Sequence, residues 1–439
     1  MKLCVCPSYR ETVMTGSGVI RANQRGELSF RLAGRVPSPF PDVFSGDRPQ
    51  GALYDIDDHV MLIALDTDGR EWRSEPLLIH PNIEEIVKGY MSSKLESLLH
   101  HRNRQKSTES TVRMYIPKQS QFPFDKSTSE ERKVGEQIIS GGWSLDHHER
   151  NFGEAKVTFR KETDGWLSVT AKQQSSMMPD WPGLMCHALS FAVAESIRPA
   201  IVVRSYNDSE QIGLFSGPFH KWHSLMPRPI VGLAPESAES FWSLVEQFFA
   251  HVWERRDTPL QILPELQAIR GGAAMPIHTA SLTLAIGIEA LAKELLPDVP
   301  PSRWNLHAKA ELVDYLADWT GDDNTRDRVL SWLKSKGESR VKDRLYAWAT
   351  QTDTPHALVD HWSSLRNRRA HGSVLDESQP SYDRYYCVVE LLYRLVAWAI
   401  GYDGRLLETS RHGWGLDEEE RQLAEESAKE STDPTPTDD

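Results

Sequence analysis

The sequence predicts an α+β fold, in which a β-rich N-terminal half is followed by an all-α helical bundle. Asp-Gly pairs at 68–69 and 164–165 each separate two apolar-alternating segments. This pattern is typical of β-hairpins, because glycine accepts the positive φ that a tight turn requires. Three prolines and a glycine between 227 and 235 mark a junction, and beyond it apolar residues recur at helical spacing.

The length of 439 residues exceeds that of a typical single domain. We expect a β-rich sensor or regulatory domain over residues 1–230 and a helical bundle over residues 236–412. Residues 416–439 are rich in Asp and Glu and end in an alternating Pro-Thr segment. We expect this tail to be largely disordered, because it has too little apolar surface to bury.

Three hairpins and two further strands are expected in the N-terminal half. A helix over Leu184–Ser196 interrupts them, and the polar stretch His101–Ser110 is predicted to be an exposed loop. The expected strands are Val19-Ile20 with Leu28–Leu32, Val60–Leu65 with Glu71–Arg73, Val157–Arg160 with Trp166–Thr170, and the separate segments Val112–Ile116 and Ile201–Val203.

Amphipathic segments fill the C-terminal half. In Ser381–Ile400, for example, apolar residues alternate at spacings of four and three, which is typical of the buried face of a bundle helix. The other expected helices are Glu236–Arg256, Pro276–Leu296, Ala308–Trp319, Arg326–Lys336, Val341–Ala349 and His356–Ala370.

Charge is distributed unevenly along the chain. The formal net charge is -13, and an acidic balance normally argues against a nucleic-acid partner. The tail 416–439 carries ten acidic and two basic residues, a net charge of -8, so residues 1–415 carry only -5. The tail therefore accounts for most of the imbalance, and an RNA partner is compatible with the rest of the chain.

The four cysteines, Cys4, Cys6, Cys186 and Cys387, are too scattered for a disulfide framework. Cys4 and Cys6 also lack a second pair of Cys or His residues at metal-ligand spacing. Charged residues interrupt the N-terminus, and the most apolar run is too short to cross a bilayer. We expect a cytoplasmic protein with reduced thiols and no membrane partner.

A polar motif ends the expected helix His356–Ala370. It reads Leu-Arg-Asn-Arg-Arg-Ala-His-Gly over residues 365–372, and Asn367 and His371 would share a helix face. The Arg366 side chain is long enough to swing toward His371 near the helix end. Arginine and histidine are the residue types that bind phosphate and exchange protons near neutral pH.

Residues Arg366–Gly372 resemble the Arg-polar-x3-His signature of HEPN domains, small helical bundles of which many are metal-independent ribonucleases. The segment Ile288–Leu291 resembles part of their earlier core helix, so the resemblance covers about 175 residues of the chain. A β-rich half before such a bundle is similar in layout to the ApeA-like HEPN proteins of bacterial anti-phage defence. The resemblance implies an HEPN-like bundle that cleaves RNA, tRNA among the candidates, in abortive infection.

RNA cleavage without metal or cofactor needs a base for the ribose 2′-hydroxyl, an acid for the departing 5′-oxygen and a cation for the phosphorane. We expect Arg366, His371 and Asn367 to be the catalytic residues, and Arg368 and Arg369 to bind the RNA backbone. One such His per chain, where acid and base together favour two, predicts a homodimer or a higher even-numbered oligomer. A phage-derived trigger is a further expected partner.

Other interpretations remain open. Arg366 and His371 could simply complement the dipole at a helix C-terminus. The bundle could be an inactive HEPN fold for dimerisation or RNA binding, joined to a ligand-sensing β domain. His220 and His223 could belong to a metal-dependent hydrolase, although no carboxylate is obviously placed beside them. The adjacent pairs His100-His101 and His147-His148 are expected in exposed loops. The basic cluster Arg340, Lys342 and Arg344 is expected on a solvated helix face, with contact to RNA as the alternative.

Overall fold

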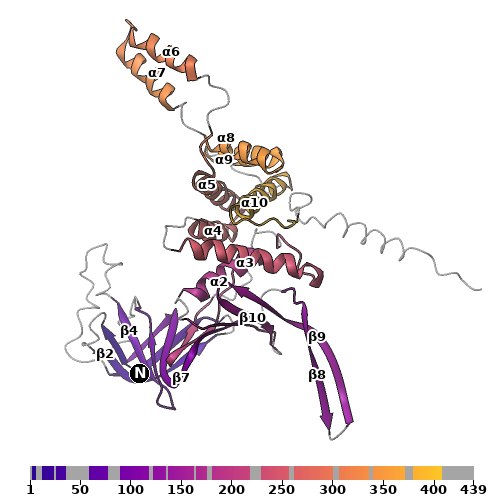
Figure 1. Ribbon diagram of the computed structural model, residues 1–439. Helices are drawn as coiled ribbons and strands as arrows, with labels where there is room; N and C mark the ends of the chain where they lie inside the picture. Colours follow the sequence, from indigo (N-terminus) through magenta and orange to yellow (C-terminus); the bar gives the residue numbers. More distant parts are fainter. Residues whose placement is uncertain are drawn as a thin grey trace, which may run out of the picture. The chain divides into compact units, whose positions relative to one another are not determined.

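The computed structural model has a β-sheet region in the N-terminal half and a helical region in the C-terminal half, which confirms the predicted α+β class (Figure 1). The residues that the structure describes are 2–5, 12–23, 26–35, 59–77, 89–117, 122–134, 137–162, 165–175, 180–217, 229–256, 262–299, 306–335, 340–370 and 379–407. The predicted tail 416–439 lies outside these residues.

One sheet of twelve strands, paired antiparallel, makes up the N-terminal region. Its order is β6-β3-β2-β1-β4-β5-β7-β11-β10-β9-β8, and β12 pairs with β7 outside this path. The strands are β1 (Lys2–Val5), β2 (Thr12–Ala22), β3 (Leu28–Arg35), β4 (Val60–Leu65), β5 (Glu71–Ser74), β6 (Tyr90–Leu95), β7 (Ser97–Ile116), β8 (Lys126–Val134), β9 (Gln137–Phe152), β10 (Ala155–Lys161), β11 (Leu167–Gln173) and β12 (Ile201–Phe215).

The three predicted hairpins are confirmed as β2/β3, β4/β5 and β10/β11. In the β4/β5 turn, Asp66 Oδ1 accepts the backbone N–H groups of Asp68 and Arg70, each at 2.9 Å. Gly69 has a φ of +77°, which a side chain would strain. Turn chemistry that is local in sequence therefore sets the register of these strands.

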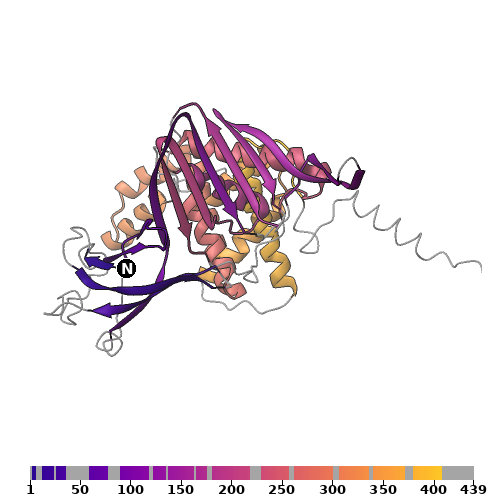
Figure 2. The same ribbon diagram turned by 90° about the horizontal axis from the view of Figure 1, so that it is seen from below.

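Strand β7 joins the two halves of the sheet. Its partner β12 follows it along most of its length, whereas β5 pairs with its first residues and β11 with its last. The loop predicted at His101–Ser110 is wrong, because these residues lie inside β7. Arg102 and Glu210 are directly opposite each other in the β7/β12 pair, so polar side chains on both strands compensate one another. Figure 2 shows the strands of the sheet side by side.

Alternating side chains of the first strands form a buried apolar face. In β3, Leu28, Phe30 and Leu32 are buried while the residues between them are exposed. The remaining members of this core come from β2, β4, β6, β7 and Leu77: Met14, Val60, Leu62, Leu77, Met91, Leu95 and Leu98.

Among the described residues beyond 234, helices are joined by turns and no strand occurs, and each helix predicted there is present. An additional helix, α4, was not predicted. The elements are α2 (Trp181–Val193), which interrupts the strands, the 3-10 turn η4 (Pro235–Ser237), α3 (Ala238–Glu254), α4 (Ile262–Ala273), α5 (Ile277–Leu295), α6 (Leu306–Ala317), α7 (Asp323–Ser335), α8 (Val341–Gln351), α9 (His356–Ala370) and α10 (Gln379–Ala399).

Two compact units divide the chain. One comprises residues 1–190, 196–221 and 234–238, and the other residues 191–195, 222–233 and 239–439. In the second unit, the Phe191 ring stacks on Phe248 with centroids 4.9 Å apart and lies 5.4 Å from Tyr393. None of the described helices has the length and apolar character needed to cross a membrane.

Candidate functional site

Helix α9 carries the sequence motif and packs through one apolar face. Leu358, Val359, Trp362 and Leu365 are all nearly inaccessible to solvent, at spacings that place them on one side of the helix. Asn367 is exposed. The last turns of α9 therefore combine a buried anchor with a polar face that reaches solvent.

Two contacts, one turn apart on both helices, join α9 to α5. Trp362 Nε1 donates to the Ala285 carbonyl at 3.1 Å. One turn further, Arg366 donates from Nε to Glu289 Oε2 at 2.5 Å and from Nη2 to Oε1 at 3.1 Å. The residue numbers rise by four on both helices, so α5 and α9 run in the same direction. The packed indole thus fixes where the guanidinium meets the carboxylate.

Opposite charge governs the ionisation of this pair. The hydrogen bond from Arg366 is the largest influence on Glu289 and lowers the pKa of its carboxyl group, helped by Lys293 at 3.1 Å. The same bond raises the pKa of Arg366. The Glu289 side chain is 19% exposed and that of Arg366 is 43% exposed. Near neutral pH the site therefore holds a fixed ion pair with a solvent-facing cation.

Within the described part of the chain, one nitrogen of the Arg366 guanidinium is left for another ligand. Nε and Nη2 face Glu289, whereas Nη1 forms no hydrogen bond to any described residue. A carboxylate that binds one edge of arginine leaves the other nitrogen directed away from the pair. Such an arrangement can offer a positioned N–H donor to a phosphate oxygen.

The other predicted site residues are placed only in part. The backbones of Arg368 and Arg369 lie in the last turn of α9, but their side chains are not among those described. His371 follows the last described residue of α9 and lies outside the described residues. The structure therefore brings Arg366 and Asn367 to the end of α9 and leaves the position of His371 as a prediction.

Glu289, which binds Arg366, and Lys293, which binds Glu289, were not predicted as site residues. Both stand one turn apart in the most apolar run of the chain, beside the buried stripe of α5. A charged pair inside such a run was the available signal, because a charge on a packed helix usually has a partner.

Side chains of α8 form hydrogen bonds to α5 and to α9. Arg344 donates to the carbonyls of Lys293 and Leu296 at 3.2 Å each, and so caps the C-terminal end of α5. Tyr346 donates to Asp360 of α9, and burial together with this bond raises the pKa of Tyr346 to about 12. Arg344 thus contributes to helix packing. The expectation of a solvated helix face for this residue did not include that contribution.

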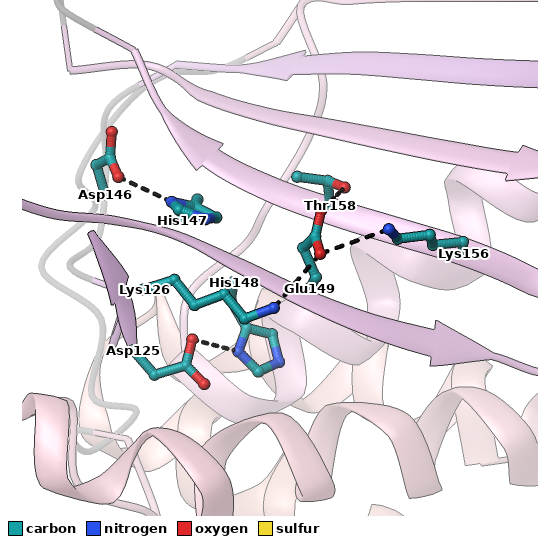
Figure 3. A network of polar contacts seen from close by, with 8 residues as sticks. All are labelled: Asp125, Lys126, Asp146, His147, His148, Glu149, Lys156 and Thr158. Atoms are coloured by element: carbon teal, nitrogen blue, oxygen red, sulfur yellow. Dashed lines mark hydrogen bonds and ion pairs between the residues drawn. The ribbon is translucent and has the colours of Figure 1, made fainter. Parts of the chain in front are cut away.

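A second charged cluster lies in the sheet region (Figure 3). His148 Nδ1 and Asp125 Oδ1 are 2.9 Å apart, and His148 is 3% exposed. The carboxylate of Glu149 lies 3.4 Å from Lys126 Nζ and 3.5 Å from Lys156 Nζ. Partial burial would raise the pKa of Glu149, but the two lysines outweigh it and lower that pKa.

These contacts hold neighbouring strands together. Thr158 lies directly opposite Glu149 in the β9/β10 register and donates to it at 3.3 Å. Lys126 of β8 and Lys156 of β10 both face Glu149 of β9, and Asp125, the residue before β8, contacts His148 of β9. Cross-strand pairs of this kind stabilise a sheet and match partners along it.

The expectation that the paired histidines lie in exposed loops is wrong. His100 and His101 lie in β7, and His147 and His148 lie in β9. Successive residues of a strand face opposite sides of the sheet, so one member of each pair, His100 or His148, becomes buried.

The proposed metal ligands receive no support from the described residues. His220 and His223 lie outside them, as does Cys6, and the side chain of Cys4 is not described. Within the described part of the chain, no group of three or more His, Cys, Asp or Glu residues is placed to hold a metal ion.

Comparisons with known proteins gave no match: no family model, no curated protein and no solved structure is similar to this chain.

Proposed function

We propose that this protein is a metal-independent endoribonuclease of HEPN type that acts in bacterial anti-phage defence. The proposal places Arg366, His371 and Asn367 in the catalytic site and Arg368 and Arg369 on the RNA backbone. Two protomers of a homodimer, or of a higher even-numbered oligomer, supply the complete site.

The observation that carries this proposal is the fixed position of Arg366. Glu289 binds one edge of its guanidinium, and the side chain remains 43% exposed. A preorganised donor stabilises the charge that develops on a phosphorane, because no reorganisation is needed as the reaction proceeds. The neighbouring exposed Asn367 adds a hydrogen-bonding group beside it.

The reaction uses the ribose 2′-hydroxyl as the nucleophile. A base removes its proton, the 2′-oxygen attacks phosphorus, and an acid protonates the departing 5′-oxygen. We assign the proton transfers to His371 of the two protomers, since an imidazole titrates near neutral pH. Asn367 orients the imidazole or the phosphate. The products are a 2′,3′-cyclic phosphate and a 5′-hydroxyl.

The wider setting follows from the HEPN resemblance. The substrate is an RNA, with tRNA among the candidates, and a phage-derived molecule triggers cleavage in the cytoplasm. In this proposal the sheet region is the sensor, and growth arrest follows from RNA loss. No metal or cofactor takes part in the reaction as written.

A second candidate function is an inactive HEPN-type protein that only dimerises or binds RNA, with a ligand-sensing β domain. The observation that favours it is the same ion pair, because two of the three guanidinium nitrogens already face Glu289. An arginine held in this way can serve only to join two helices, without any ligand.

Cleavage of total RNA in EDTA distinguishes the two candidates. The intact chain, Arg366→Ala and His371→Ala would be assayed with and without extract from phage-infected cells. Arg102→Ala is the matched control, because Arg102 forms a similarly exposed pair with Glu210 in the sheet. We expect cleavage by the intact chain and the control, and a loss of about 100-fold or more in both site variants.

Three results would contradict the ribonuclease. Equal cleavage by the site variants would show that Arg366 and His371 are not the catalytic residues. Cleavage that stops in EDTA would favour a metal-dependent enzyme. No cleavage with or without the extract from infected cells, together with RNA retardation in a gel, would favour the binding protein.

A further inference from the structure

The helical hairpin formed by α6 and α7 exposes an apolar stripe. Leu312 and Tyr315 are 42% and 68% exposed and lie three residues apart on one side of α6. Trp319, in the turn after α6, is 39% exposed. Trp332 of α7 is 52% exposed. Exposed large apolar groups gathered in this way mark interaction surfaces.

The hairpin is ordered at its turn. Asp322 accepts the backbone N–H of Thr325 at 2.8 Å and its hydroxyl at 2.7 Å, and so caps the start of α7. A Cβ at Gly321 would lie 2.5 Å from Nε1 of Trp319, so the indole rests against the backbone of the turn. The stripe therefore ends on a packed tryptophan.

The hairpin buries little apolar surface of its own. Among its described side chains, Leu316 and Leu333 are the buried apolar residues. Helices of 12 and 13 residues are marginal in water without tertiary packing. Covering the exposed stripe would therefore stabilise the hairpin as well as the complex.

An acidic stripe runs beside the apolar one. Each of its members directly precedes an apolar member, as Glu311-Leu312, Asp314-Tyr315 and Asp318-Trp319. Neighbouring residues in a helix differ by about 100° in direction, so Glu311 and Asp314 lie beside Leu312 and Tyr315 on α6. Asp318 precedes Trp319 in the turn after the helix. The whole hairpin, residues 306–335, contains six acidic and four basic residues, a net charge of -2.

This charge selects among the possible occupants. Nucleic acid and anionic lipid would meet carboxylates of like charge. A second copy related by a two-fold axis would bring a second acidic stripe to the same contact, because a two-fold contact uses the same patch on both partners. A helix with an apolar face bordered by Lys or Arg satisfies both stripes at once.

We propose that α6 is the docking surface for a basic amphipathic helix of another protein. Leu312, Tyr315 and Trp319 contact its apolar face, and Glu311, Asp314 and Asp318 pair with its cations. This surface goes beyond the proposed ribonuclease and does not depend on it.

Binding of synthetic peptides to the full-length chain tests this surface. The probe is a fluorescein-labelled helical Leu/Lys peptide of about 18 residues, five helical turns, followed by anisotropy. A peptide of the same composition in scrambled order and a Leu/Glu peptide of the same pattern are the peptide controls. We expect the patterned Leu/Lys peptide to bind best.

Two sets of variants test the two stripes. Leu312→Gln with Tyr315→Gln removes apolar contact, and Glu311→Gln with Asp318→Asn removes charge while preserving shape. Matched controls are Leu65→Gln with Tyr206→Gln, which are 65% and 44% exposed elsewhere. For the charge set, Glu96→Gln with Asp403→Asn is the control. We expect about tenfold or weaker binding for each stripe variant and unchanged binding for both controls.

The proposal is overturned if either stripe variant binds the peptide as well as the intact chain. Equal binding of the scrambled peptide would also overturn it, since general charge attraction would then suffice. Sedimentation of the intact chain and the apolar variant tests the remaining occupant. A change from dimer to monomer in that variant would show that a second copy covers the stripe, contrary to the proposal.

Discussion

Two arginine–carboxylate pairs of similar exposure lie in the two regions of this molecule. In the sheet, Arg102 contacts Glu210 with Nε at 2.6 Å, and the side chains are 53% and 12% exposed. In the helical region, Arg366 contacts Glu289 with Nε at 2.5 Å, and the exposures are 43% and 19%. Exposure and distance alone therefore do not distinguish a structural pair from one proposed to serve catalysis.

The surroundings of the two pairs differ. Arg102 and Glu210 are register partners in an antiparallel ladder, so the backbone already sets their separation. Arg366 and Glu289 lie on different helices and are 77 residues apart in the sequence, so only side-chain packing sets their position. A cation positioned by packing at the end of a polar helix face is a better candidate for ligand binding than one within a ladder.

The largest expected effect is on packing beside the helical pair. Trp362→Ala should lower the free energy of unfolding by about 3–5 kcal/mol, because it leaves a cavity and removes the indole hydrogen bond to the Ala285 carbonyl. Urea denaturation followed by circular dichroism measures the change. Trp332→Ala is the control, since an indole 52% exposed loses little on truncation. Equal losses in both variants would contradict the packing that positions Arg366.

The second prediction separates the two pairs by activity. Glu289→Gln and Glu210→Gln should each lower stability by about 1 kcal/mol or less, since solvent screens exposed ion pairs. Only Glu289→Gln should also slow RNA cleavage, by about tenfold, because the guanidinium loses its fixed position. Initial cleavage rates in EDTA, compared with unfolding curves, measure both effects. A matching loss of activity in Glu210→Gln would remove the distinction between the pairs.

The third prediction concerns pH. The pKa of Glu289 is lower in the folded chain than its ordinary value of 4.5, so the ionised carboxylate stabilises the folded state. That contribution is fully present above pH 4.5 and is lost as pH falls through the lowered pKa. The stability difference between the intact chain and Glu289→Gln should therefore be constant from pH 7 to about 5.5 and shrink below 4.5. A difference that grows on acidification would contradict the ion pair.

The smallest expected effect is in the sheet cluster. Lys126→Met should change the free energy of unfolding by about 0.5 kcal/mol or less, because Lys156 still faces Glu149 and both lysines are solvated. Thermal unfolding at low and high salt measures it. A loss of several kcal/mol would assign this cluster a larger structural role than the helical pair.

The sequence predicted those parts of the fold that depend on local chemistry. The hairpin around Asp68-Gly69 and helix α9 followed from turn residues and apolar spacing alone. The loop prediction for residues 101–110 was wrong, because their polar composition is typical of a loop. Their ladder partner lies about 100 residues away in the sequence, in β12. Single-sequence patterns do not contain pairing at that separation.

The candidate site was predictable to a similar degree. Arg366 and Asn367 could be named because their motif is contiguous. Glu289 could not be assigned as the partner of Arg366, because the contact depends on how α5 and α9 pack. The charge at Glu289 within an apolar helix indicated only that some partner was needed.

The chemistry of the RNA ends tests the central claim most directly. The intact chain would be incubated with a defined RNA in EDTA, and the fragment termini identified by mass spectrometry. Attack by the 2′-hydroxyl without metal predicts a 2′,3′-cyclic phosphate on one fragment and a 5′-hydroxyl on the other. Fragments with 3′-hydroxyl and 5′-phosphate ends, or cleavage that requires added metal, would contradict the account.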